Sequence, residues 1–204
     1  MLSVYRLKPL FQAWLRPLVR RLATLGVSAN ALTLFAMLVS CALGAWLLAA
    51  GDSRLFLLLP LWMFLRMALN AVDGMLAREF GQASPLGAYL NELTDVVSDA
   101  ALYLPFVAIA PFGWGSVGTV IFLAALSEMT GALGPMVGAA RQYDGPMGKS
   151  DRALVFGGLG LWLGLAGVLP GWAYWLMPAV AALIVLNIGN RIRSGLARTS
   201  PPRN

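Results

Sequence analysis

Long apolar runs, separated by short polar breaks, make up most of the chain. The runs lie at residues 31–50, 55–77, 86–110, 115–139, 153–169 and 173–190. A helix needs about 20 apolar residues to cross the hydrocarbon of a bilayer, and every break between the runs contains turn-forming residues. The pattern predicts an all-α integral membrane protein whose six transmembrane helices form one domain over residues 27–194, followed by a cytoplasmic tail at 195–204.

The first 26 residues show a different pattern. Between residues 4 and 24, apolar residues recur at helical spacing with Lys and Arg between them. This pattern is typical of an amphipathic helix lying in the membrane interface, which Pro17 is expected to kink or split. A disordered basic arm is the alternative. Ser28 and Asn30 follow this segment, and both are expected to cap the first membrane helix.

Composition agrees with a membrane protein. Hydrophobic residues make up 59% of the chain and charged residues 12%, whereas soluble domains carry about a quarter charged residues. The 15 Lys and Arg exceed the 9 Asp and Glu, and most of them lie in the N-terminal segment, two loops (78–85 and 140–152) and the tail. Because basic residues collect on the cytoplasmic side of membrane proteins, both termini are expected to be cytoplasmic. Their spread over several segments argues against a nucleic-acid partner.

The supply of reactive residues is limited. The chain has no histidine and a single cysteine, Cys41, inside an apolar run. A disulfide framework and a metal site built from imidazole or thiolate ligands are therefore excluded. Any catalysis must rest on carboxylates, and any bound metal is expected to be a hard cation such as Mg²⁺, Mn²⁺ or Ca²⁺.

Acidic and amide side chains gather around the break between the second and third apolar runs. Charges at the edge of a bilayer are costly, so they normally face a polar cavity and mark function. Residues four apart on a helix drift by only about 40° per step and therefore share a face. Oxygen ligands on two neighbouring antiparallel helices would build a site for a hard cation. These candidate ligands are Asn70 and Asp73 on the second run, and Asn91, Glu92, Asp95 and Asp99 on the third.

The stretch from residue 70 to residue 95 resembles the signature of the CDP-alcohol phosphotransferase (CDP-alcohol phosphatidyltransferase) family. The family pattern is Asp-x2-Asp-Gly-x2-Ala-Arg-x8-Gly-x3-Asp-x3-Asp. Every spacing is kept, and six of the eight fixed positions match. The eight positions read Asn70, Asp73, Gly74, Ala77, Arg78, Gly87, Asn91 and Asp95. Six spans after an interfacial helix also resemble the family's architecture.

The resemblance implies a reaction in phospholipid biosynthesis. An acceptor hydroxyl attacks the β-phosphorus of a CDP-linked lipid such as CDP-diacylglycerol, and CMP leaves. In the family, the four acidic positions hold divalent metals and the last one is proposed as the general base. The implied cofactor is therefore one or two Mg²⁺ or Mn²⁺ ions, and the implied partners are the CDP-linked donor, an acceptor alcohol and the lipid bilayer. Carried over, Asp73 and Asp95 would be metal ligands with Asp95 also the base, and Gly74, Ala77, Arg78 and Gly87 would contact the CDP moiety.

Two departures from the signature matter. Asn70 and Asn91 stand where the family has its first and third aspartates, so two negative charges are missing although amide oxygens can still ligate a hard cation. In one interpretation Glu92 and Asp99 restore the carboxylates, or a single metal suffices. In the other, the protein is a non-enzymatic partner or regulator of lipid synthesis. Asp99 has a second interpretation as a buried carboxylate paired with Arg66 or with another helix.

Basic residues near the fifth and sixth runs are further candidates. Lys149 and Arg152 lie where family members bring basic groups towards the acceptor or its phosphate, although an orientation-setting loop is the alternative. Arg191 and Arg193 would either join that pocket or anchor the chain. Glu128 would line the acceptor pocket or pair with Arg66. A small transporter is a weaker interpretation, because the chain shows no inverted repeat. Family members often form homodimers, but no dimer face stands out. The sequence favours an inner-membrane transferase.

Overall fold

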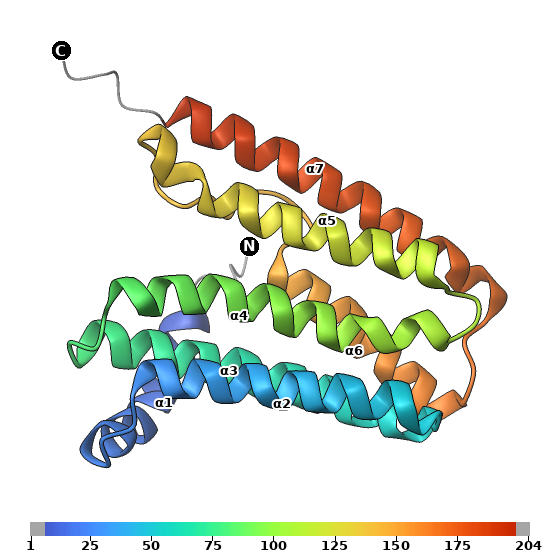
Figure 1. Cartoon of the computed structure of the whole chain (residues 1–204), viewed down its shortest axis with the longest axis horizontal. Helices are drawn as coiled ribbons and strands as arrows, with labels where there is room; N and C mark the ends of the chain where they lie inside the picture. Colours follow the sequence, from blue (N-terminus) through green and yellow to red (C-terminus); the bar gives the residue numbers. More distant parts are fainter. Residues whose placement is uncertain (1–6, 199–204) are drawn as a thin grey trace.

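Each apolar run forms a helix in the computed structural model, which describes residues 7–198 (Figure 1). The helical part of the sequence prediction is therefore confirmed. Short 3-10 helices extend or join several of the long helices. In chain order the elements are α1 (Leu7–Thr24), α2 (Ala29–Ala50), η2 (Ser53–Leu57), α3 (Leu58–Glu79), α4 (Pro85–Tyr103), η3 (Leu104–Ala108), α5 (Trp114–Ala132), η4 (Gly134–Val137), α6 (Lys149–Ala166), η5 (Gly171–Trp175) and α7 (Leu176–Ala197).

The first helix, α1, runs through Pro17 as one continuous helix, so the expected split does not occur. It packs against the end of α3, where buried Val19 belongs to the same apolar cluster as Leu76. The Arg16 guanidinium also pairs with the Glu79 carboxylate at 3.0 Å. Residues 4–6 of the expected interfacial helix lie outside the described residues, as do residues 199–204 of the expected tail. A position in the membrane interface stays a prediction.

Serine caps begin the two helices on either side of α3. The Ser28 hydroxyl accepts a hydrogen bond from the Ala31 amide at 3.1 Å at the start of α2, which confirms its predicted role. Asn30 is not the cap, because it already lies inside the first turn of α2. Ser84 caps α4 in the same way, with Pro85 at the first helical position. Both caps satisfy backbone amides that a helix start leaves without partners.

The long helices pack in neighbouring pairs (Figure 1): α2 lies against α3 and α4, α3 against α6, α4 against α5, and α5 against α7. Gly44 lies where α2 closely approaches the backbone of α4. A Cβ atom at this position would lie 2.1 Å from the backbone oxygen of Ala101, which is far inside contact distance. Further along the bundle, the Tyr103 and Phe156 rings stack with their centroids 3.8 Å apart and join α4 to α6.

Four helical segments of the described chain are long and apolar enough to cross a membrane: Ala29–Ala50, Ser53–Glu79, Trp114–Ala132 and Gly171–Ala197. Of the other long helices, α4 and α6 carry three charged residues each, which lowers their hydropathy. The structure is thus that of a helical membrane protein with several spans, and the count of six stays a prediction. Helix α7 also continues to Ala197, past the expected domain end at residue 194.

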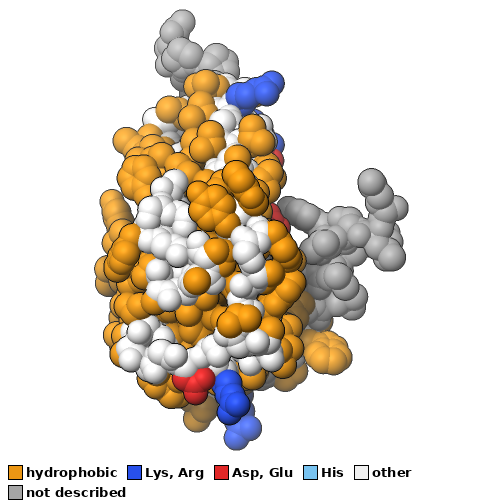
Figure 2. Space-filling view, turned by 90° about the vertical axis from the view of Figure 1, so that its right-hand side faces the viewer, with side chains coloured by type: hydrophobic (Ala, Val, Ile, Leu, Met, Phe, Trp, Pro, Cys, Tyr) orange, Lys and Arg blue, Asp and Glu red, His pale blue; other side chains and the backbone are white. Residues whose placement is uncertain are grey.

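Charge is distributed unevenly along the bundle. The end viewed in Figure 2 is covered mostly by hydrophobic and uncharged side chains and shows few charged ones. The connections after α3 and α5 and the end of α7 lie together at the opposite end (Figure 1). The signature residues and most of the ion pairs described below belong to that second end.

Candidate active site

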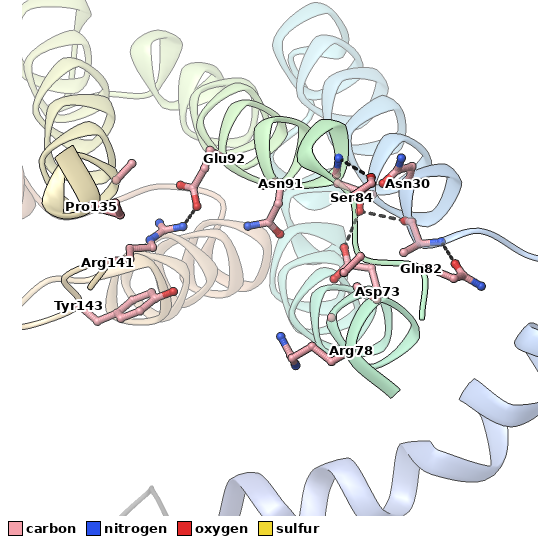
Figure 3. A pocket seen from close by; sticks show the side chains of 18 residues that line it. Asn30, Asp73, Arg78, Gln82, Ser84, Asn91, Glu92, Pro135, Arg141 and Tyr143 are labelled. Atoms are coloured by element: carbon pink, nitrogen blue, oxygen red, sulfur yellow. Dashed lines mark hydrogen bonds and ion pairs between the residues drawn. The ribbon is translucent and has the colours of Figure 1, made fainter. Parts of the chain in front are cut away.

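Helices α3 and α4 bring the signature together, because the short turn between them returns the chain antiparallel to itself. Six of its eight positions line one cavity of about 440 Å³ (Figure 3). In the view of Figure 3, Asp73 and Arg78 lie on one side of the cavity, Arg141 and Tyr143 lie on the other, and Asn91 and Glu92 lie between them. The six signature residues in the lining are Asp73, Gly74, Ala77 and Arg78 from α3, and Gly87 and Asn91 from α4.

The Asp73 side chain is fixed from the neighbouring helix. Its Oδ2 atom accepts a hydrogen bond from the Thr33 hydroxyl of α2 at 2.7 Å, and the residue is 5% exposed. Gln82, in the turn between α3 and α4, accepts a hydrogen bond from the Ala29 amide at 2.7 Å and so ties this turn to α2. Sequence reasoning missed Thr33 and Gln82, since each meets its partner through tertiary packing alone.

Gly74 lets the Arg78 guanidinium lie against the backbone of α3. A Cβ atom at Gly74 would lie 2.8 Å from Nη2 of Arg78. Arg78 is exposed and, within residues 7–198, forms no ion pair. Its guanidinium is therefore available to an anionic ligand in the cavity, in keeping with the contact to the CDP moiety that the sequence predicts.

Asp95 lies one helical turn from Asn91 and is held by three donors. Arg66 Nη2 donates to its Oδ1 atom at 3.2 Å, Asn70 Nδ2 donates to the same atom at 3.1 Å, and the Lys149 ammonium also pairs with it. In the described part of the chain, the other oxygen, Oδ2, has no hydrogen-bond partner. Asn70 and Lys149 also line a smaller cavity of about 150 Å³ between α3 and α6. Asp95 thus lies between residues of the two cavities.

Asp99 is enclosed by two arginines. Its Oδ1 accepts from Arg66 Nη1 at 2.5 Å, its Oδ2 accepts from Arg152 Nη2 at 3.1 Å, and the residue is 4% exposed. The alternative interpretation, a buried carboxylate paired with Arg66, is confirmed. Arg152 is fully buried and also donates to Glu128 at 2.8 Å, so the expected contact with an acceptor does not fit its position.

Glu128 gathers arginines from three segments of the chain, and Arg66 is not among them. Its carboxylate pairs with Arg152 at 2.8 Å, with Arg141 at 3.0 Å and with Arg191 at 3.5 Å. Arg141 also pairs with Glu92 on the cavity wall and lies over the Tyr143 ring, 5.0 Å from its centroid. Burial lowers the pKa of the Arg141 guanidinium. Arg141 and Tyr143 were not singled out from the sequence, because a loop residue carries no periodic signal.

These residues do not fit a pair of divalent ions. Two of the four signature positions for acidic residues are already engaged with each other. Asn70 donates its amide nitrogen to Asp95, and Oδ1 of Asp95 accepts from three donors in all. Glu92 and Asp99, the carboxylates expected to replace the two missing aspartates, both form ion pairs with arginines. Within residues 7–198, no group of three or more Asp, Glu, His or Cys is placed to hold a metal ion. The predicted ligand role of Asp73 stays open, and those of Glu92 and Asp99 do not fit their contacts.

Comparison with known proteins identifies the family. A family model described as CDP-alcohol phosphatidyltransferase matches residues 26–186. The chain belongs to this family. The match confirms the resemblance inferred from the signature, and the members of this family are generally membrane transferases of phospholipid synthesis. Asn70 and Asn91 make it an atypical member.

Individual relatives of the chain agree with that assignment. Inner membrane protein YnbA of Escherichia coli (strain K12) is 45% identical over 198 residues, which cover 96% of this chain and 97% of that protein. Archaetidylinositol phosphate synthase of Aeropyrum pernix is 33% identical over 136 residues, which cover 62% of this chain and 66% of that protein. The fold is similar to the crystal structure of Mycobacterium tuberculosis phosphatidylinositol phosphate synthase (PgsA1) with CDP-DAG bound, with a TM-score of 0.61 at 18% identity over 89% of both chains.

Proposed function

We propose that the protein transfers a phosphatidyl group from a CDP-linked lipid, such as CDP-diacylglycerol, to an acceptor alcohol with release of CMP. One observation carries the proposal: six signature residues line a single cavity beside Asp95, a carboxylate with one uncommitted oxygen. The family match supports the reaction class, and the similar fold of a synthase solved with CDP-DAG bound supports this type of donor.

The larger cavity takes the CDP moiety of the donor. Ala77 has a small side chain that lets the nucleotide approach the backbone of α3, while Gly74 leaves room for the Arg78 guanidinium beside the same helix. The Arg78 guanidinium, which forms no ion pair within residues 7–198, binds the pyrophosphate, because planar guanidinium groups pair with phosphate oxygens through two parallel hydrogen bonds. The smaller cavity, lined by Asn70 and Lys149, takes the acceptor alcohol.

The chemical step uses Asp95 as the base. The acceptor oxygen attacks the β-phosphorus of the donor, and Oδ2 of Asp95 takes the hydroxyl proton as the new P–O bond forms. The bond between the β-phosphorus and the bridging oxygen breaks, and CMP leaves with that oxygen. Arg66, Asn70 and Lys149 hold Oδ1 and so fix the direction of Oδ2. The divalent ion implied by the resemblance stays a prediction.

The location follows from the donor. A lipid with a CDP head group has acyl chains in the bilayer and a nucleotide in water, so we place the signature end of the bundle at the cytoplasmic face of a cell membrane. Both termini then lie in the cytoplasm, as the basic residues predict. The acceptor is not specified by these features, and glycerol phosphate, serine, inositol phosphate and another phospholipid are all candidates. Homodimer formation also stays a prediction.

The test is CMP release by the purified full-length protein from labelled CDP-diacylglycerol, with a panel of these acceptors and with Mg²⁺ or Mn²⁺ present. We expect release with at least one acceptor. Asp73→Ala is expected to abolish it, and Asp95→Asn to lower it by roughly 100-fold or more, as removal of a general base does. Asp144→Asn, which alters only an exposed ion pair with Arg198, serves as the matched control. If no acceptor gives release above the Asp73→Ala background, the transferase proposal is wrong and the non-enzymatic partner role gains support.

A further inference from the structure

We infer that the chain neutralises the pyrophosphate of its CDP-linked donor with its own cations, with Lys149 acting in place of a divalent metal, so that donor binding needs no metal ion. This inference rests on the proposed function. It starts from the disagreement between the donor set of the site and the pair of divalent ions that the family signature implies.

The first step concerns charge. Asn70 and Asn91 replace two carboxylates by neutral amides, so the site attracts divalent cations much less strongly than four aspartates would. Asn70 further presents an N–H donor, instead of an oxygen ligand, to the Asp95 carboxylate. In this arrangement the amide nitrogen of Asn70, and not an oxygen, faces Asp95. The replacement at position 70 therefore creates a hydrogen bond where the signature has a ligand.

The second step concerns Lys149. Its ammonium group, at the start of α6, forms an ion pair with Asp95, one of the two signature aspartates that remain. The Lys149 side chain is 26% exposed, so a ligand can still reach the ammonium group. A lysine ammonium carries a compact positive charge with three rotatable donors, which suits phosphate oxygens.

The third step concerns the other cations of the two cavities, of which Arg141 is already paired with Glu92 and Glu128. Arg66 already shares Asp95 with Lys149 and is also bound to Asp99. Arg78, which lines the larger cavity from α3, is unpaired within residues 7–198. Lys149 and Arg78 together supply the two positive charges that a pyrophosphate diester requires, from α6 and α3 respectively. The competing arrangement is one Mg²⁺ ion held by Asp73 and the pyrophosphate itself.

The test is binding of CDP-diacylglycerol to the purified full-length protein in detergent, measured by titration calorimetry in excess EDTA and again in Mg²⁺. We expect the two dissociation constants to agree within about twofold, which is below ~0.5 kcal/mol. Lys149→Gln is expected to weaken binding in EDTA by roughly tenfold or more, as loss of a charge-assisted contact does. Lys149→Arg, which keeps the charge, is the matched control and is expected to bind more tightly than Lys149→Gln. Thermal unfolding of each variant checks that it is folded.

A second variant tests the origin of the effect. Asn70→Asp combined with Asn91→Asp restores the two missing charges, and we expect donor binding by this double variant to become tighter in Mg²⁺ than in EDTA. Mn²⁺ binding to the same variant, followed by electron paramagnetic resonance without any lipid, is expected to exceed that of the natural chain. Equal Mn²⁺ affinities would show that positions 70 and 91 do not control metal binding and would count against the inference.

The outcomes are distinguishable. Loss of donor binding in EDTA and its return in Mg²⁺, for the natural sequence, would overturn the inference and leave the proposed function intact. Unchanged binding by Lys149→Gln would overturn the role of Lys149. Absence of CDP-diacylglycerol binding under both conditions would overturn the inference together with the proposed function.

Discussion

Substitution of Gly44 by alanine tests the close packing on which the geometry of the site depends. Gly44 faces the backbone of α4 at Ala101, and an added Cβ would lie 2.1 Å from the Ala101 oxygen, against the 3.4 Å at which ordinary contact begins. The obstacle is backbone, so no side-chain rotation relieves it. Helices α2 and α4 must move apart. Asp95 and Asp99 move with α4, because they precede Ala101 on the same helix.

The magnitude follows from the cost of overpacking, which is about 1–3 kcal/mol for an extra carbon in a well-packed interior. For a protein of this length, each kcal/mol shifts the midpoint of thermal unfolding by about 2–4 °C. Gly44→Ala is therefore expected to lower the unfolding temperature of the purified protein in detergent by roughly 2–12 °C.

Gly118→Ala is the matched control, because a Cβ at Gly118 in α5 would meet no atom within 4 Å. Alanine is favoured over glycine inside a helix by about 0.5–1 kcal/mol, so this variant is expected to unfold at an equal or higher temperature than the natural chain. If Gly44→Ala unfolds at the same temperature as Gly118→Ala or above it, helices α2 and α4 do not approach each other as described here.

Two further predictions concern the site and its buried ion pairs. Gly74→Ala is expected to displace the Arg78 guanidinium by a few tenths of an ångström, because its Cβ would lie 2.8 Å from Nη2. In the CMP-release assay, the KM for the donor should rise while kcat changes less. An unchanged KM would argue against donor contact by Arg78. Arg152→Met leaves the buried carboxylates of Asp99 and Glu128 with fewer counter-charges. It is expected to lower the free energy of unfolding by up to about 3–5 kcal/mol. Arg16→Met, which removes an exposed ion pair, should lower it by less than about 1 kcal/mol. Thermal unfolding compares the two variants, and equal shifts would contradict the buried network.

Much of the fold follows directly from the sequence pattern. The apolar runs became helices, and the four-residue spacing of Asn91, Asp95 and Asp99 placed them on α4 opposite α3, as expected. The signature spacing likewise identified six residues of the larger cavity without any tertiary information. These features depend on local geometry alone, namely the helical period and a short turn between antiparallel helices.

The partners in the buried ion pairs could not be predicted from the sequence pattern. Periodicity indicates that Asp99 and Glu128 face inward, but it does not indicate which helix supplies the counter-charge. Arg152 lies 53 residues from Asp99 in the sequence, and the two meet only after α6 has packed into the bundle. The arginine partners of Glu92 and Asp99 come from distant segments, so the sequence alone did not show that these carboxylates are already paired.

The matched charges of α4 and α6 have a consequence for how the chain enters a membrane. If α4 and α6 span the membrane as predicted, each helix alone would carry charge into lipid, at up to about 2.5–3.5 kcal/mol per charge, which is the insertion cost at a helix centre. Together they are complementary, because Lys149 pairs with Asp95 and Arg152 pairs with Asp99. Pairing of α4 with α6 before they enter the lipid would therefore lower the cost of inserting them. In that case the candidate site would form while these two helices are being inserted.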